Sequence, residues 1–209
     1  MQTLLYIEAS PLKMHSHSID VARAFLETYS QVHPQDEIDQ LDLWDTLLPP
    51  FDAYTINAKF AVLRKHCFTP EQLAAWEAVR AVARRFNRAE KYVFSVPMWN
   101  FSIPYPLKHF IDVVTLPGEN WSWSKEAGYS GLLHNKKALL IYASAGDYHA
   151  AAASQWRDFQ KPYLRQWLSF LGVTDIHEIT VAPTLTEPES LAKTKHEAKA
   201  AATALATTF

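Results

Sequence analysis

Short strand-like segments alternate with longer segments of helical periodicity along the whole of this sequence. Runs of apolar, β-branched or aromatic residues between turn residues are typical of strands in a sheet. The strand candidates are residues 4–7, 37–43, 92–96, 138–143 and 176–182. A helical pattern follows each of them, the first from Ile19 and the last from Pro188 to Ala206. This alternation predicts a parallel sheet that helices cover on both faces.

The number of strand candidates sets the expected architecture. Five strands in 209 residues predict a single domain, residues 1–209, folded as a three-layer α/β sandwich around a five-stranded parallel sheet. We expect the doubly wound strand order 2-1-3-4-5. Ligands of such sheets bind beyond the carboxyl ends of the strands, at the switch point between the first and third. The loops after the first, third and fourth strands are therefore the expected site.

Two helix boundaries have clear local signals. Residues 69–72, Thr-Pro-Glu-Gln, combine a cap residue, a proline in the first turn and a glutamine that can close a capping box, so they predict a helix start. A later helix is expected from Ser154 to Gly172, and Pro162 either kinks it or marks its true beginning.

The composition excludes several classes of function. The 20 Lys and Arg residues against 22 Asp and Glu give a net charge of -2, which disfavours nucleic acid as a partner. Cys67 is the only cysteine, which excludes an internal disulfide or a multi-cysteine metal site and favours a cytoplasmic location. The longest apolar run, residues 138–143, is too short to span a bilayer. The chain reaches Glu8 without a basic leader, so we expect no signal peptide and no membrane partner.

Glycine is scarce, and the 5 glycines all lie at or beyond Gly118. A Walker loop and the G-x-G-x-x-G turn of dinucleotide-binding folds both need glycine just after the first strand, so both are excluded. A phosphate site in the first loop must instead consist of hydroxyl groups and backbone amides.

The loop after the first strand has that composition. Ser10, Ser16, His17 and Ser18 run into the start of a helix, with Lys13 nearby. Free amides and hydroxyls at a helix start bind anions. The alternative is that a serine only caps the helix, which requires one oxygen. His17 with its neighbour His15 would be an incomplete metal site, and no metal is expected.

The loops after the third and fourth strands each allow two interpretations. Residues 97–104 form an aromatic, amide-bearing turn between prolines, which suits either the core or the wall of a flat ligand site. Residues 144–149 contain Gly146, which either permits a close approach of the backbone or belongs to a plain turn. His149 is either a proton donor or a surface histidine.

Three blocks of residues carry a resemblance to a known family. They are Ser10 with Ser16-His17-Ser18, then Pro97-Met98-Trp99-Asn100-Phe101 with Ser102-Ile103-Pro104 and Leu107-Lys108, and lastly Gly131-Leu132-Leu133 with Lys136-Lys137-Ala138 and Ser144-Ala145-Gly146. In order and separation they resemble the FMN-dependent NADH-azoreductases, which are also NADH:quinone oxidoreductases. The resemblance implies a flavodoxin-like fold and a cytoplasmic homodimer with two active sites at the subunit interface, each subunit binding one FMN.

The resemblance also implies roles for individual residues. Ser10, Ser16, His17 and Ser18 would bind the FMN phosphate, and Pro97, Met98, Trp99, Asn100 and Phe101 would run along the isoalloxazine, with the Asn100 backbone near N5. Ser144, Ala145, Gly146 and Asp147 would face the pyrimidine end of the flavin. Trp123 and Trp167 match aromatic positions that wall the substrate side, and His149 matches a histidine beside the ring.

Three positions depart from the family pattern. Trp99 replaces a tyrosine and loses its phenol, and His17 replaces a glutamine, which makes phosphate binding sensitive to pH. Ala145-Gly146-Asp147 replaces Arg-Gly-Gly, which removes a cation and adds a carboxylate beside the flavin. This last change bears on the flavin potential and on the charge of the preferred substrate.

The implied activity is a ping-pong reaction in which NADH reduces FMN, and the reduced flavin then reduces a quinone or, over two cycles, cleaves an azo compound to two amines. The sequence leaves open which acceptor is physiological and whether NADH is preferred to NADPH. Two other functions remain as alternatives: a flavin-binding electron carrier that serves a protein partner, and a flavodoxin-like domain without cofactor that acts in assembly.

Overall fold

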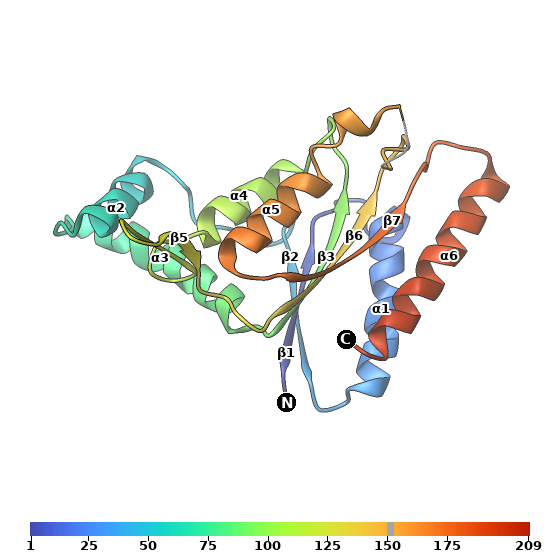
Figure 1. Ribbon diagram of the computed structural model, residues 1–209, viewed down its shortest axis with the longest axis horizontal. Coiled ribbons are helices and arrows are strands. Elements are labelled where there is room, and N and C mark those ends of the chain that lie inside the picture. The colour runs from blue at the N-terminus through green and yellow to red at the C-terminus, as the bar shows by residue number, and fades with distance from the viewer. Residues whose placement is uncertain (150–152) are drawn as a thin grey trace.

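The computed structural model of the chain describes residues 1–149 and 153–209, and its centre is a five-stranded parallel sheet (Figure 1). The strand order is β2-β1-β3-β6-β7, which confirms the expected order 2-1-3-4-5 along the chain. The strands are β1 (Thr3–Glu8), β2 (Glu37–Asp42), β3 (Lys91–Pro97), β6 (Lys137–Ala143) and β7 (Asp175–Val181). Each pair of neighbours is parallel and in continuous register.

Helices cover both faces of the sheet, as Figure 1 shows. One face carries α1 (His17–Val32) and α6 (Pro188–Ala206), and the other carries α3 (Pro70–Arg88), α4 (Tyr105–Val114) and α5 (Lys161–Leu171). Alternate strand residues point to opposite faces, so Leu4 packs under α1 while Leu5 packs under α3 and α4. The result is two buried apolar layers, one on each side of the sheet.

The two predicted helix starts have different outcomes. The Thr69 side chain accepts from the N–H of Gln72, and Gln72 accepts in return from the N–H of Thr69, so the predicted capping box is confirmed. The start predicted at Ser154 is wrong, because α5 begins at Lys161 with Pro162 in its first turn. A proline lacks the N–H that a helix interior requires, so this residue marks the true beginning.

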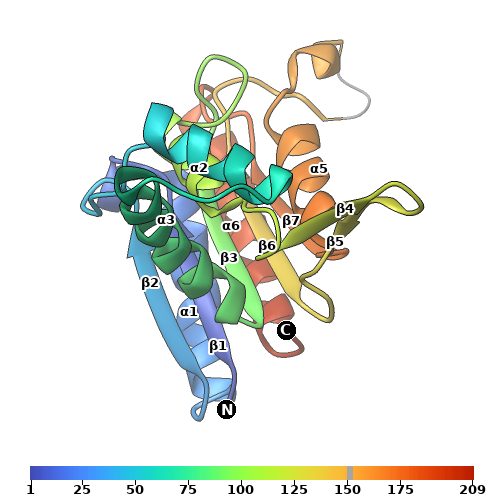
Figure 2. The ribbon, with the colours of Figure 1, turned by 90° about the vertical axis from the view of Figure 1, so that its left-hand side faces the viewer.

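Two elements were not expected from the sequence. Helix α2 (Ala53–Arg64) packs on α3, and its start is capped by Asp52. Strands β4 (Trp121–Ser124) and β5 (Gly128–Gly131) form an antiparallel hairpin that lies beside α5, outside the main sheet (Figure 2). Each hairpin strand has only four residues, which is too short for an alternating pattern to stand out.

Backbone hydrogen bonds hold the loops at the carboxyl edge of the sheet beside one another. The N–H of Ala9 donates to the carbonyl of Ser95, and that of Met98 donates to Ala143. These bonds continue the sheet past the ends of β1 and β3 and bring together the three loops that the sequence indicates. Across residues 1–149 and 153–209, every helix lacks either the length or the apolar run that crossing a membrane requires.

Candidate functional site

The first loop passes through one turn of 3-10 helix, η1 (Lys13–His15), and then enters α1. Ser16 caps α1, because its Oγ accepts from the N–H of Ile19 at 3.4 Å. The hydroxyl groups of Ser16 and Ser18 lie 3.2 Å apart, and the Oγ of Ser10 accepts from the N–H of Leu12 at 3.4 Å. The expected cap is therefore present, and it uses one of the three serines.

The remaining polar groups of this loop are arranged for an anion. The exposed fractions of Ser10, Ser16 and Ser18 are 1%, 4% and 0%, so their hydroxyl groups are withdrawn from bulk water. Within the described chain, the N–H groups of His17 and Ser18 donate to no backbone carbonyl. Unused amides at the positive end of a helix, next to buried hydroxyls, form the type of site that holds a phosphate. We name this set, residues 10 and 16–18, the serine loop.

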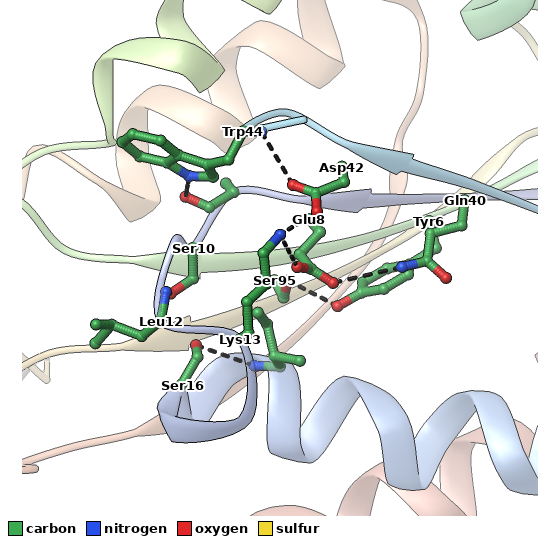
Figure 3. A network of polar contacts seen from close by, with 12 residues as sticks. Tyr6, Glu8, Ser10, Leu12, Lys13, Ser16, Gln40, Asp42, Trp44 and Ser95 are labelled. Carbon is green, nitrogen blue, oxygen red and sulfur yellow. Dashed lines mark hydrogen bonds and ion pairs between the residues drawn. The ribbon is translucent and has the colours of Figure 1, made fainter. Parts of the chain in front are cut away.

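Two titratable side chains of the first loop have environments that the structure defines. Lys13, expected near a phosphate, turns instead toward Glu8 and Asp42 and donates to both carboxylates (Figure 3). His17 is half-buried at the start of α1, and burial together with the nearby charge of Lys195 lowers its pKa. The neutral imidazole is therefore favoured in the chain without a bound anion.

The turn after β3 has an unusual backbone. Asn100 and Phe101 have φ values of 46° and 70°, a conformation that residues other than glycine seldom adopt. Trp99 and Ser102 close the turn by exchanging two N–H to carbonyl bonds of 2.9 Å. Elsewhere in the described chain, no carbonyl accepts from the N–H of Asn100 or Phe101. The turn thus presents two N–H donors on exposed residues at the carboxyl edge of the sheet.

Aromatic contacts connect this turn with the first loop. The Trp99 ring lies 5.5 Å from the ring of Trp44 and 6.4 Å from that of Tyr105. Trp44 in turn donates its indole N–H to the carbonyl of Ala9 at 3.1 Å. Trp99 is therefore held by neighbours on both sides, and it belongs to the site edge rather than to the core beneath the sheet.

The loop after β6 is folded on itself and more open. Ser144 is buried and donates its hydroxyl to the carbonyl of Gly146 at 2.8 Å. A Cβ at Gly146 would lie only 3.0 to 3.2 Å from atoms of the Tyr148 phenol, so the glycine leaves room for this side chain. Tyr148 also contacts the edge of Phe101, with ring centroids 6.5 Å apart. This loop and the turn after β3 therefore touch.

Asp147 and His149 form a pair at the end of this loop. The Nδ1 of His149 lies 2.7 Å from Oδ1 of Asp147, and the backbone N–H of His149 donates to the same oxygen at 3.1 Å. These hydrogen bonds hold the pKa of Asp147 below its usual value. A carboxylate that accepts from Nδ1–H leaves the Nε2 atom of His149 free, and that side chain is 60% exposed.

A groove of about 630 Å³ borders the turn after β3. Its lining is mostly apolar and comes from the turn, α4 and the start of α5: Ser102, Ile103, Lys108, Phe159, Pro162, Tyr163 and Gln166. The sequence did not indicate this groove, because its lining residues lie far apart in the chain and only the fold brings them together. A flat apolar molecule fits a space of this size and character.

Comparison with known proteins identifies the family. The model of a family described by its flavodoxin-like fold matches residues 2–205. An FMN-dependent NADH:quinone oxidoreductase of Desulfotalea psychrophila is 44% identical to this chain over 206 residues, which are 99% of this chain and 97% of that protein. This chain belongs to the FMN-dependent NADH:quinone oxidoreductase family.

Further relatives and solved structures agree with this assignment. An FMN-dependent NADH:quinone oxidoreductase of Nitratidesulfovibrio vulgaris is 42% identical over 195 residues, 93% of either chain. A crystal structure of azoreductase from Bacillus anthracis superposes with a TM-score of 0.91 at 26% identity and covers both chains fully (100%). An FMN-dependent NADH-azoreductase from Bacillus anthracis in complex with FMN gives a TM-score of 0.86 at 28% identity, covering 99% of this chain and 100% of that one. The resemblance and the flavodoxin-like fold are confirmed.

One site residue taken from the resemblance to this family packs into the core layer of the chain. Trp167, expected to wall the substrate side, is only 6% exposed, stacks on Phe86 and donates its indole N–H to Thr115 at 2.9 Å. Its role at the substrate side stays a prediction. Trp123 lies on β4 of the hairpin, outside the main sheet, and is 58% exposed.

The aromatic residue of α5 that faces the hairpin is Phe170. Its ring lies 5.6 Å from that of Trp121 and 5.7 Å from that of Tyr129. Phe170 is one helical turn after Trp167, so both carry the same periodic signal. The hairpin itself was needed to distinguish them, and its position on α5 is a tertiary contact.

Proposed function

We propose that this chain is an FMN-dependent NADH:quinone oxidoreductase that also cleaves aromatic azo compounds. Family membership supports an oxidoreductase with FMN as cofactor. The observation that carries the proposal is the serine loop, which combines three buried hydroxyls with two unused amides at the start of α1. This donor set fits a phosphate monoester without a glycine-rich loop. A mononucleotide is favoured because one helix start suits one phosphate group.

The roles proposed for the individual residues come from the resemblance to the family. Ser10, Ser16, His17 and Ser18 bind the phosphate group. The turn formed by Pro97, Met98, Trp99, Asn100 and Phe101 supports the isoalloxazine with its free N–H donors, and Ser144, Ala145, Gly146 and Asp147 border the pyrimidine end. The bound FMN supplies hydride chemistry, accepting two electrons from NADH and passing them to the second substrate.

The chain's own residues position the substrates and donate a proton to the acceptor. The groove beside the turn takes the flat acceptor, and its apolar walls exclude water from the face where transfer occurs. His149, oriented by Asp147, presents Nε2 to a substrate oxygen or nitrogen that gains a proton on reduction. NADH and the acceptor use the same space in turn, which gives a ping-pong reaction.

We further propose a cytoplasmic homodimer. Several large apolar side chains are exposed on α2, on the hairpin and near the start of α5, among them Phe60, Trp123, Tyr129 and Phe159. Apolar residues at this density are typical of a surface that a second subunit covers. Trp123 would then wall the substrate side from the interface. A single cysteine is compatible with a reducing compartment.

Steady-state NADH oxidation, measured with and without a benzoquinone, tests the function. Turnover that depends on the quinone, with parallel double-reciprocal plots, supports the proposed enzyme. Oxidation that occurs only with a partner protein would instead support a flavin-binding electron carrier. A purified protein that is colourless, and stays so after addition of FMN, would point to a domain without cofactor and contradict the proposal.

A further inference from the structure

Lys13 joins the ends of two neighbouring strands to the first loop. Its ammonium donates to Oε1 of Glu8 at 2.8 Å and to the carboxylate of Asp42 (Figure 3). Glu8 is the last residue of β1, and Asp42 is the last residue of β2. We name these three residues the lysine clasp.

The lysine clasp also constrains the backbone of the first loop at Lys13. Lys13 has a φ of 48°, in the left-handed region that a lysine without other constraints avoids. Its carbonyl accepts from the N–H of Ser16 at 3.0 Å, and Ser16 is the residue that caps α1. The conformation at Lys13 therefore determines where the capping serine stands, and the two carboxylates hold that conformation in place.

Asp42 extends the clasp to the turn after β3. Its Oδ1 accepts from the N–H of Trp44 at 3.0 Å, and the Trp44 ring contacts that of Trp99. Trp44 also donates to the carbonyl of Ala9, at the beginning of the first loop. One cluster of charges thus connects both parts of the site that contact a flavin mononucleotide under the proposed function.

Charge balance makes the lysine essential to this cluster. Glu8 is only 5% exposed, and a buried carboxylate is costly unless a cation compensates it. Burial raises the pKa of Asp42, but the ammonium of Lys13 and the N–H of Trp44 outweigh it and hold that pKa below its usual value. Asp42 therefore stays ionised. Without Lys13, the side chains of Glu8 and Asp42 would have no cation between them beside a site for a phosphate dianion.

We propose that Lys13 is a positioning residue, which bridges Glu8 and Asp42 and so holds residues 10–16 in the conformation that binds the phosphate of FMN. This inference rests on the proposed function. Lys13 does not contact the ligand itself, since its ammonium is already engaged by two carboxylates. It acts through the backbone of the first loop and through Ser16.

The test compares FMN with riboflavin, which has the same ring system and no phosphate. Dissociation constants are measured by quenching of flavin fluorescence, on flavin-free full-length protein, for the wild type, Lys13→Met and Lys13→Arg. We expect Lys13→Met to weaken FMN binding by about tenfold and riboflavin binding by less than about twofold. Lys13→Arg keeps the bridge and should stay within about threefold of wild type for FMN. Lys193→Met, the same charge change at an exposed position of α6, is the matched control.

Asp42→Asn distinguishes positioning from direct contact. If Lys13 acts through the clasp, Asp42→Asn weakens FMN binding, and the double variant with Lys13→Met is no weaker than Lys13→Met alone. If Lys13 instead binds the phosphate, Asp42→Asn frees the ammonium and tightens FMN binding, which overturns the inference. Should Lys13→Met fail to fold, as judged by far-ultraviolet circular dichroism, Asp42→Asn alone decides between these outcomes.

The proposed function and this inference fail in different ways. A wild-type protein that binds neither FMN nor riboflavin contradicts the proposed function. A wild-type protein that binds FMN, with Lys13→Met binding it equally well, contradicts only the role of Lys13. An equal loss of FMN and riboflavin affinity in Lys13→Met would show a general structural defect and would also overturn the inference.

Discussion

The serine loop after β1 and the loop after β6 lie at the same edge of the sheet, yet they are built differently. The three serines of the first are almost fully buried and are held by a helix start. In the second, the side chains of Asp147 and His149 are 41% and 60% exposed. A buried, preformed donor set suits a group that stays bound, and an open pair of titratable groups suits molecules that come and go. Under the proposed function, the first loop retains the phosphate of the cofactor, and the second borders the flavin and meets substrates.

Two tryptophans show the same contrast between a buried and an exposed position. Replacing the buried one should produce the largest change predicted here, in the free energy of unfolding. Trp167→Ala removes a buried ring and its hydrogen bond to the hydroxyl of Thr115, so it should lower the free energy of unfolding by about 3–5 kcal/mol. Trp123→Ala, on the exposed hairpin, should change it by less than about 1 kcal/mol. Urea denaturation of the two variants measures both values. Equal losses would contradict the assignment of Trp167 to the core and Trp123 to the surface.

The second largest change is expected in FMN affinity, when serines of the serine loop are replaced. The double variant Ser16→Ala, Ser18→Ala removes two of the three buried hydroxyls of the serine loop, and FMN affinity should fall by about a hundredfold. Flavin fluorescence titration measures this loss. Ser190→Ala, at the exposed start of α6, is a matched control that should bind FMN as the wild type does. If the double variant loses less than about threefold in FMN affinity, the serine loop is not the part of the site that retains FMN.

A smaller change is expected in the rate of quinone reduction, when the loop after β6 is altered. Asp147→Asn removes the carboxylate that orients His149, so quinone reduction should slow by about three- to tenfold, while FMN affinity stays within about twofold. Single-turnover reoxidation of the reduced protein by a benzoquinone measures the first, and flavin titration the second. The account of this loop is contradicted if Asp147→Asn loses FMN but reoxidises at the wild-type rate.

His17 is the half-buried member of the serine loop, and it predicts the smallest effect. Its pKa in the folded, flavin-free chain lies below the ordinary value of 6.5, so the unfolded chain takes up the proton first. This residue's contribution to stability is therefore present above pH 6.5 and declines as pH falls through the lower folded pKa. Relative to His17→Gln, the wild type should lose less than about 1 kcal/mol between pH 7 and pH 5. Thermal unfolding of both proteins across this range measures the difference. A wild type that gains stability relative to His17→Gln as the pH falls would contradict the prediction.

The sequence was sufficient for the strand order and for the edge of the sheet where the loops meet. Both follow from the alternation of strands and helices, which parallel sheets permit in few topologies. It was also sufficient for the capping box at Thr69 and for the serines at the start of α1, because caps depend on residues adjacent in the chain. Features that depend on neighbours in sequence are the ones that a pattern predicts.

Features that depend on neighbours in space were missed or misassigned. Lys13 stands among serines in the sequence, but its partner Asp42 is 29 positions away, on another strand. Trp167 and Phe170 share one helix, and only the packing of the hairpin shows that Phe170 faces outward to it. Helix α2 has a weak apolar face, so its existence depends on its contact with α3. In each case the missing information was the tertiary partner.

The most direct test of the central claim is the ratio of the FMN and riboflavin dissociation constants of the wild-type, flavin-free protein. If the serine loop holds the phosphate with buried hydroxyls and helix amides, FMN should bind at least about a hundredfold more tightly than riboflavin. Equal affinities for the two flavins would show that the phosphate group is not held by this loop, and the account would fail.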